Sequence, residues 1–396
     1  MRKEKKAAKE IWKYFLFLLD SVFRLLSKTS AIIQRKNGLK NILLIRVDGI
    51  GDSILWLDSQ NGLMKVYPPD SYQYTLVCNK HSYSIFKSFE IFDKIIAIDK
   101  NSFYTNLRYR FKTLRSICSV RYDIIVQPTY SREFAVGDSI VRLAKSPVKI
   151  GSVGDRSNST ILQKNISDNW YTKLVPASDS VLMELERNAE FIRGLGLDGF
   201  MASVPVLPNC ASAVEIHKKP YFVVFPGSIT IRKMWPAERF SEIARKVYQK
   251  KGWLTVICGS NGELEACGRI YSSLKDIPVL NLAGKTSIES LSEVIREAEL
   301  LISNDTGSIH IAAAVSTPSV CILGGGHLGR FLPYFINGRF PENAPVCVIH
   351  PMDCFNCSWQ CIHTIRGNDP FPCIQNILVD EVWEKVSGVL IERAGD

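Results

Sequence analysis

From about residue 40 onward, short apolar runs alternate with segments of helical periodicity, and no other feature constrains the fold as strongly. Such alternation is typical of a parallel sheet covered by helices. In the first half we expect helices at residues 53–67 and 104–119, and strands at 41–45, 74–78, 94–98 and 122–128. The sequence therefore predicts an α/β, doubly wound fold for this half.

The alternation stops at residues 205–220, which hold three prolines and little periodicity, and then restarts. In the second half we expect strands at 221–227, 253–259, 279–285, 300–305 and 319–323, and helices at 237–251, 264–274, 287–298 and 308–315. A chain of 396 residues is long enough for two such domains. We predict Rossmann-like domains at 41–207 and 221–396, joined by a linker at 208–220 and facing a cleft.

The N-terminal segment, residues 1–40, is basic at its start and largely apolar afterwards. Its longest unbroken apolar run, residues 14–19, is much shorter than the ~20 residues that cross a bilayer. We predict an amphipathic helix on an anionic membrane surface; the alternative is a helix packed on the protein's own body. A signal anchor is disfavoured, because Asp20 and Arg24 would lie in hydrocarbon.

The net charge of +10, from 49 Lys and Arg against 39 Asp and Glu, favours an anionic partner. The anionic partner could be nucleic acid, a nucleotide-linked substrate or an anionic membrane surface. Charged residues make up 22% and hydrophobic residues 46%, which excludes a disordered or fibrous chain.

A glycine-rich turn, RVDGIGDSI at residues 46–54, follows the first expected strand. Asp48 and Asp52 put carboxylates where a dinucleotide-binding turn would hold pyrophosphate, and the third glycine of that pattern is missing. The turn therefore disfavours an NAD-type oxidoreductase. The plainest role for Asp52 is to cap the helix that follows.

The segment LLISNDTGSIHIAAA, residues 300–314, carries a buried strand into a tight turn and a helix of small residues. The first amides of such a helix can hold a phosphate, and Thr306 and Gly307 suit that position. Asp305 cannot help to bind phosphate but can accept hydrogen bonds from sugar hydroxyls. A simple capping role for Asp305 or Thr306 is the alternative.

Two further turns carry polar groups. In FPGSITIRKMWPAERF, residues 225–240, Arg232 and Lys233 follow a strand and could neutralise a diphosphate leaving group, although a solvated basic turn is the alternative. In GSNGELE, residues 259–265, the carboxylate of Glu263 could bind a ribose diol.

Together, IRVDGIGDSI, FPGSITIRKMWPAERF, GSNGELE, LAGKTS and SNDTGSIHIAAA resemble the ordered motifs of glycosyltransferase family 9, the ADP-heptose:lipopolysaccharide heptosyltransferases. The resemblance runs from about residue 41 to 330. It implies a GT-B fold, with the nucleotide sugar held mainly by the second domain, and an inverting transfer without a catalytic metal.

The resemblance also implies roles for single residues. Asp52 corresponds to the base that acts on the acceptor hydroxyl. On chemical grounds, Lys233 would also serve catalysis, because a cation stabilises the departing diphosphate. Arg232 departs from the family, where acidic or polar residues often precede the lysine. The implied donor contacts are Ser228 and Lys233 on phosphate or ribose, Glu263 on ribose, Thr286 near adenine, Asp305 on the transferred sugar, Thr306 and Gly307 on the diphosphate, and His310 of the DTG-x-x-H pattern.

Four of the eleven cysteines crowd into residues 350–376, with spacing C-x2-C-x3-C-x11-C. Cys354, Cys357, Cys361 and Cys373 could complete a tetrahedral structural site for zinc or iron, with His363 close by. Reduced or redox-active thiols and a disulfide pair are the alternatives. Some heptosyltransferases that modify proteins carry a comparable four-cysteine finger, and a closed shell of four thiolates leaves no open position for catalysis.

The sequence thus predicts a cytoplasmic glycosyltransferase, peripheral on the inner face of the inner membrane. It would move a heptose or similar sugar from an ADP-sugar to a lipopolysaccharide-like glycolipid, with no nucleic-acid partner. Alternatives are another nucleotide sugar, another glycolipid or a protein acceptor. A metal-stabilised binding protein without catalysis is the alternative of a different class.

Overall fold

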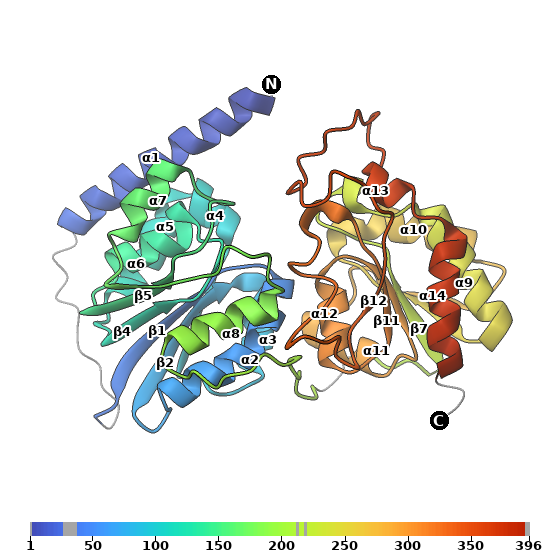
Figure 1. Ribbon diagram of the computed structural model, residues 1–396, viewed down its shortest axis with the longest axis horizontal. Coiled ribbons are helices and arrows are strands. Elements are labelled where there is room, and N and C mark those ends of the chain that lie inside the picture. The colour runs from blue at the N-terminus through green and yellow to red at the C-terminus, as the bar shows by residue number, and fades with distance from the viewer. Residues whose placement is uncertain (1, 27–37, 211–213, 218–219, 393–396) are drawn as a thin grey trace. The chain divides into compact units, whose positions relative to one another are not determined.

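The computed structural model describes residues 2–26, 38–210, 214–217 and 220–392 (Figure 1). The chain forms two compact units: Met1–Ser53, Ser59–Asp179 and Arg187–Phe200 make the first, and Ile54–Asp58, Ser180–Glu186 and Met201–Asp396 the second. Residues 27–37 of the predicted N-terminal segment, and 211–213 and 218–219 of the predicted linker, lie outside the described residues.

Each unit holds a six-stranded parallel sheet. The strands of the first are β1 (Lys40–Arg46), β2 (Tyr72–Asn79), β3 (Lys94–Ile98), β4 (Ile124–Gln127), β5 (Val148–Ser152) and β6 (Lys173–Val175). Those of the second are β7 (Tyr221–Phe225), β8 (Leu254–Ile257), β9 (Val279–Asn281), β10 (Leu301–Asn304), β11 (Ser319–Ile322) and β12 (Val346–Val348).

The strand orders, β3-β2-β1-β4-β5-β6 and β12-β11-β10-β7-β8-β9, both follow the Rossmann pattern 3-2-1-4-5-6. The predicted α/β fold of two doubly wound, Rossmann-like domains is confirmed. The cleft between them stays a prediction.

Helices cover both faces of each sheet (Figure 1). In the first half of the chain they are α1 (Arg2–Leu26), α2 (Ile50–Val66), α3 (Tyr83–Lys87), α4 (Lys100–Thr105), α5 (Leu107–Cys118), α6 (Ser139–Leu143), α7 (Ile161–Asp168) and α8 (Glu184–Gly194). In the second half they are α9 (Ala237–Lys251), α10 (Leu264–Ser273), α11 (Ile288–Arg296), α12 (Gly307–Ala314), α13 (Pro372–Gln375) and α14 (Val379–Glu392).

The apolar runs of the sequence are strands buried on both faces. Ile42, Leu43, Leu44 and Ile45 of β1 are all inaccessible to solvent, because helices cover the sheet above and below. In the second unit, β7, β8 and β10 pack against α9, α10 and α14 in one apolar cluster. These cores fix the strand ends and therefore the turns that follow them.

The structure differs from the predicted elements in several places; for example, the helix expected at residues 53–67 begins at Ile50, and α3, α6, α7, α8, α13 and α14 were not predicted. The single helix expected at residues 104–119 is broken into α4 and α5 at Asn106, whose side chain accepts a hydrogen bond from the Tyr109 amide and so caps α5. Strands β5, β6 and β12 were not predicted, because β5 mixes polar and small residues with apolar ones and the other two have three residues each.

Helix α1 packs on the first unit through one face. Leu16 and Asp20 are buried there, and Asp20 accepts a hydrogen bond of 2.8 Å from Nε of the buried Arg110. The indole of Trp12 donates to the carbonyl of Tyr104. This packing on the protein's own body is the alternative considered for the N-terminal helix, and it leaves another face of α1 exposed. None of the described helices is long and apolar enough to span a membrane.

Candidate active site

In sheets of this order, ligands bind at the carboxyl ends of the strands where the chain order reverses. These switch points lie between the neighbours β1 and β4 in the first sheet, and between β7 and β10 in the second. Asp52 follows β1, Ser228 and Lys233 follow β7, and Asp305 and Thr306 follow β10. The structure therefore brings the predicted residues to the switch point of each sheet.

In the first unit, the turn after β1 leads directly into α2. The helix begins at Ile50, so Asp52 is its third residue and Gly49 its N-cap. The Asp52 carboxylate is half-buried and accepts a hydrogen bond from the Gly49 amide at 3.2 Å. This contact satisfies one amide at the start of the helix, and an asparagine could make it equally well.

Asp48 has a positioning role, in keeping with the supporting part that the sequence suggested for it, and the structure shows its contacts. Its carboxylate accepts a hydrogen bond of 2.8 Å from the Thr129 hydroxyl, in the turn after β4, and lies 3.4 Å from the buried Arg46 guanidinium. Arg46 also donates to the carbonyl oxygen of Asp52. Asp48 therefore joins the two turns of the switch point and holds the backbone that carries Asp52.

In the second unit, Asn304 does the equivalent work. It is the last residue of β10 and fully buried. Its side-chain amide donates to the carbonyls of Pro226 at 2.6 Å and Gly227 at 3.3 Å, and its oxygen accepts from the Trp235 amide. Sequence reasoning gave Asn304 no role, although an amide at the end of an apolar strand was the signal that could have revealed it.

Lys233 and Asp305 form the charged centre of this switch point. Burial lowers the pKa of Lys233, and the nearby Asp305 carboxylate opposes that shift. Burial raises the pKa of Asp305, and Lys233 opposes it in turn. The Lys233 ammonium also lies 3.9 Å from the centre of the Trp359 ring. A cation is thus held beside Asp305 in partly desolvated surroundings, where charge–charge interactions are strong.

The start of α12 has no side-chain cap. Thr306 is its N-cap but makes no side-chain hydrogen bond to the helix amides; its hydroxyl instead pairs with that of Ser308 at 2.8 Å. No acidic residue lies in the first turn. The Ile309 amide donates to the Thr306 carbonyl, so the amides of Gly307 and Ser308 are those that present partial positive charge suited to an anion.

The remaining predicted donor residues lie in neighbouring turns. Glu263 follows β8, caps the Ser260 amide, and lies over Gly227, where an added Cβ would come 2.0 Å from its carboxyl carbon. Ser228 follows Gly227 and is half-buried. Thr286 lies in the turn after β9, which is joined to the β8 turn by a hydrogen bond from the Gly284 amide to the Gly259 carbonyl.

The arrangement has counterparts among known proteins. The sequence model of the family described as glycosyltransferase family 9 (heptosyltransferase) matches residues 110–337, which is more than half of the chain. The protein belongs to glycosyltransferase family 9. The matched range includes the β7 and β10 turns of this family 9 member, whereas Asp52 and the Cys-rich segment lie outside it.

Among curated proteins, this family 9 chain is 27% identical over 228 residues to lipopolysaccharide heptosyltransferase 3 of Escherichia coli K12. The match covers 55% of this chain and 62% of that protein. Among solved structures, E. coli ADP-heptose LPS heptosyltransferase II has a TM-score of 0.65 at 18% identity, covering 89% and 99% of the two chains. The iron-containing heptosyltransferase TibC, in complex with ADP-D-β-D-heptose, has a TM-score of 0.52 at 13% identity, covering 89% and 77%.

Two predicted donor residues of this family 9 chain point elsewhere. His310 lies in the core, where its Nδ1 is 2.7 Å from the Tyr334 hydroxyl and burial lowers its pKa to about 4. Its ring is therefore neutral near pH 7 and holds α12 against the segment carrying Tyr334. Arg232 donates to the carbonyl of Gly367, so its side chain contacts the Cys-rich segment.

The Cys-rich segment, residues 350–376, packs on the glycine turn after β11. Backbone amides of Asn356 and Ser358 donate to the carbonyls of Gly325 and Gly326. A Cβ on Gly326 would lie 2.4 Å from the Trp359 ring, so only glycine permits this approach. The segment thus places Trp359 against Lys233, a link that sequence reasoning missed.

The four thiols of this segment are close to one another without forming a metal shell. The thiols of Cys357, Cys354 and Cys361 add to the effect of burial in raising the pKa of Cys373. The Cys354 sulfur lies 3.7 Å from Nε2 of His363. Among the described residues, no three His, Cys, Asp or Glu side chains are grouped closely enough to hold a metal ion. The eleven cysteines, all described, are free thiols.

Proposed function

We propose that the protein is an inverting glycosyltransferase that moves a heptose or similar sugar from an ADP-sugar to a lipopolysaccharide core or related glycan. One observation carries the proposal. At the switch point of the second sheet, Lys233 lies near enough to Asp305 for their charges to interact, and Asp305 directly precedes the N-cap of α12, whose amides have no side-chain cap. A cation and free helix amides suit a diphosphate leaving group, and a carboxylate suits sugar hydroxyls.

The proposed reaction is a single displacement. An acceptor oxygen attacks the anomeric carbon as its proton passes to the Asp52 carboxylate, and the bond from that carbon to the diphosphate breaks to release ADP. Asp52 acts as general base, and Lys233 with the amides of α12 stabilises the charge that develops on the leaving diphosphate. Asp48, through Thr129 and Arg46, positions the Asp52 turn.

The other donor contacts follow from the position of each turn. Asp305 accepts from hydroxyls of the transferred sugar, and Thr306 and Gly307 contact the diphosphate. Glu263 binds the ribose and Thr286 lies near the adenine, because they follow β8 and β9, which lie progressively farther from the switch point. Ser228 contacts phosphate or ribose. Arg232 and His310 support the site without contacting the donor, since Arg232 contacts Gly367 and His310 contacts Tyr334.

We further propose that the protein works on the cytoplasmic face of the inner membrane, with α1 against the lipid. The face of α1 opposite to Leu16 and Asp20 exposes an apolar stripe with the spacing of a single helix face, formed by Ile11, Phe15, Leu18, Val22 and Leu25. An apolar stripe on a basic helix is suited to an anionic membrane surface, where a glycolipid acceptor would lie.

A structural zinc or iron ion is proposed for Cys354, Cys357, Cys361 and Cys373. The support is chemical: the four cysteines have a spacing along the chain that suits a metal site, the thiols of Cys354, Cys357 and Cys361 help to raise the pKa of Cys373, and TibC, of similar fold, contains iron. Its measurable sign is a stoichiometric amount of metal in the purified protein, lost in Cys357→Ser and kept in the control Cys347→Ser, which lies outside the segment. Protein purified without metal would contradict it.

The function is tested by incubating the purified protein with ADP-, UDP- and GDP-sugars and measuring nucleotide release with and without a lipid A-core acceptor. We expect ADP release from ADP-heptose that depends on the acceptor. Donor binding without turnover, for every acceptor tried, would instead identify a binding protein that has kept the fold.

A further inference from the structure

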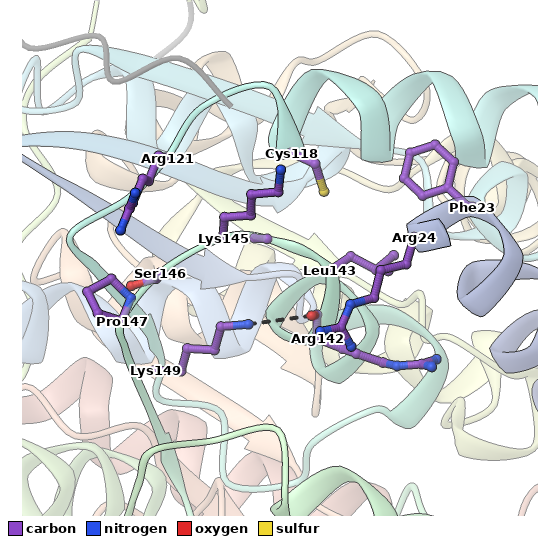
Figure 2. A pocket seen from close by; sticks show the side chains of 11 residues that line it. Phe23, Arg24, Cys118, Arg121, Arg142, Leu143, Lys145, Ser146, Pro147 and Lys149 are labelled. Atoms are coloured by element: carbon purple, nitrogen blue, oxygen red, sulfur yellow. Dashed lines mark hydrogen bonds between the residues drawn. The ribbon is translucent and has the colours of Figure 1, made fainter. Parts of the chain in front are cut away.

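A basic cavity lies at the amino ends of strands β4 and β5, the edge of the first sheet opposite to the Asp52 turn (Figure 2). Its volume is about 560 Å³. The ends of α1, α5 and α6 and the segment leading into β5 form its walls. The proposed transfer reaction does not use this cavity, because the residues assigned to that reaction follow the carboxyl ends of the strands.

The lining of this cavity is strongly cationic. Of its eleven lining residues, all described, five are cations and none is acidic; the cations are Arg24, Arg121, Arg142, Lys145 and Lys149. A concave surface lined by charges of one sign concentrates its electric field and attracts counter-ions. Figure 2 shows these side chains coming from α1, α6 and the segments around residues 121 and 145–149.

Two of the cations are held in place before any ligand arrives. The Lys149 ammonium donates to the carbonyl of Val141 at 2.6 Å. The Arg142 guanidinium donates to the Phe17 carbonyl and the Ser21 hydroxyl of α1, and stacks 4.1 Å from the centre of the Phe17 ring. Fixed cations lose little conformational entropy on binding, which favours affinity.

The surroundings of Lys149 disfavour its positive charge. Burial and, to a smaller extent, the charge of Arg24 lower the pKa of Lys149 to about 8. An anion in the cavity would oppose both effects. Arginine and lysine side chains together are typical of phosphate sites, where guanidinium groups offer paired donors.

The cavity adjoins the exposed stripe of α1. Phe23 and Arg24, which line the cavity, lie between Val22 and Leu25 of the stripe, and both of these are at least half exposed. A lipid-facing helix that ends beside a basic cavity would bring phosphate headgroups close to it.

We propose that this cavity is a binding site for a phosphate group, separate from the donor site. Two sources share this chemistry: the headgroup of an anionic phospholipid, and a free phosphate in solution. In either case the phosphate would hold the end of α1 to α6 and to the start of β5, because Arg24, Arg142 and Lys149 would contact it together.

The test is hydrogen exchange of the full-length protein, followed in peptides covering residues 118–121 and 142–149. One arm adds inorganic phosphate. The other adds vesicles of equal parts phosphatidylcholine and phosphatidylglycerol, with pure phosphatidylcholine vesicles as reference. Protection in the first arm alone identifies free phosphate, and protection in the vesicle arm alone identifies the lipid headgroup. Protection in both supports the site with either source.

Variants locate the effect. Arg121→Gln combined with Lys149→Gln should weaken the binding of whichever probe protects these peptides by about tenfold or more. The matched control, Lys94→Gln with Arg108→Gln, removes the same charge from exposed positions that do not line the cavity and should change little. Arg121→Gln alone, at an exposed position, replaces the double variant if that fails to fold. No protection by either probe, or an equal loss in the control, would overturn the proposal.

Discussion

The two switch points have the same strand order but opposite chemistry. In the first unit, α2 begins with its own carboxylate, since Asp52 accepts from the Gly49 amide. In the second, α12 begins with Thr306, whose hydroxyl turns to Ser308 and leaves the helix amides without a side-chain cap. One helix start is filled by an acid, and the other is left for an anion.

This difference shows how one fold can divide a reaction. A helix start that already holds a carboxylate repels phosphate but can place a base. A helix start without one is a phosphate site. Both are braced by a polar residue that joins the two turns, Asp48 to Thr129 in the first unit and Asn304 to the Pro226 turn in the second. The fold therefore sets the positions, and single side chains set the chemistry.

The largest expected effect comes from Asp52→Asn. The amide can still accept from Gly49, so we expect the melting temperature to stay close to that of the parent protein. Transfer should fall by about 10²–10⁴-fold because the base is lost. Steady-state ADP release and calorimetric titration with the ADP-sugar measure the two quantities. Donor affinity should stay within a few fold; a parallel loss of donor binding would make Asp52 a donor-site or structural residue.

The second substitution gives α12 the acid that α2 already has. Thr306→Asp should stabilise the helix start by about 0.5–1 kcal/mol while weakening ADP binding roughly a hundredfold by charge repulsion. Thr306→Ser is the matched control and should change neither quantity much. Thermal unfolding measures the change in stability, and titration with ADP measures the change in affinity. Unchanged ADP affinity in Thr306→Asp would mean that these amides do not hold the diphosphate.

The third prediction concerns pH. Since burial lowers the pKa of Lys233, its positive charge is lost at a lower pH than that of an exposed lysine. We expect kcat/KM for the donor to fall as pH rises through this lowered pKa, roughly tenfold per pH unit once the lysine is neutral. Lys233→Arg keeps its charge to higher pH, so whatever activity it retains should not show this alkaline fall. An identical fall in both proteins would assign it to another group.

The sequence was informative where chemistry follows directly on an apolar strand. Asp52, Lys233, Asp305 and Thr306 all lie within a few residues of a strand end, so a local pattern was enough to single them out. The boundaries of β1, β3 and α9 were predicted to within one residue for the same reason.

The remainder depends on residues that are distant in the sequence. The role of Asn304 requires the register of β10 beside β7, which no local pattern encodes. His310 lies in the DTG-x-x-H motif, yet its partner Tyr334 comes from a later segment and draws its ring into the core. The basic cavity gathers side chains from α1, α6 and the start of β5, and none of these is unusual alone.

The smallest effect separates the cation from its aromatic support. Trp359→Leu removes the ring beneath the Lys233 ammonium, and an interaction of about 0.5–1 kcal/mol corresponds to roughly two- to fivefold weaker donor binding. Trp359→Phe keeps an aromatic face and should recover most of that loss. Trp383→Leu is the matched control, because that ring lies near Lys246 and Lys250 and not near the donor turns. If Trp359→Leu and Trp383→Leu weaken ADP titration equally, the Cys-rich segment stabilises the second unit without positioning Lys233. If only Trp359→Leu weakens ADP binding, the Cys-rich segment is part of the donor site. The two switch points then differ also in their support, because only the second depends on such a segment.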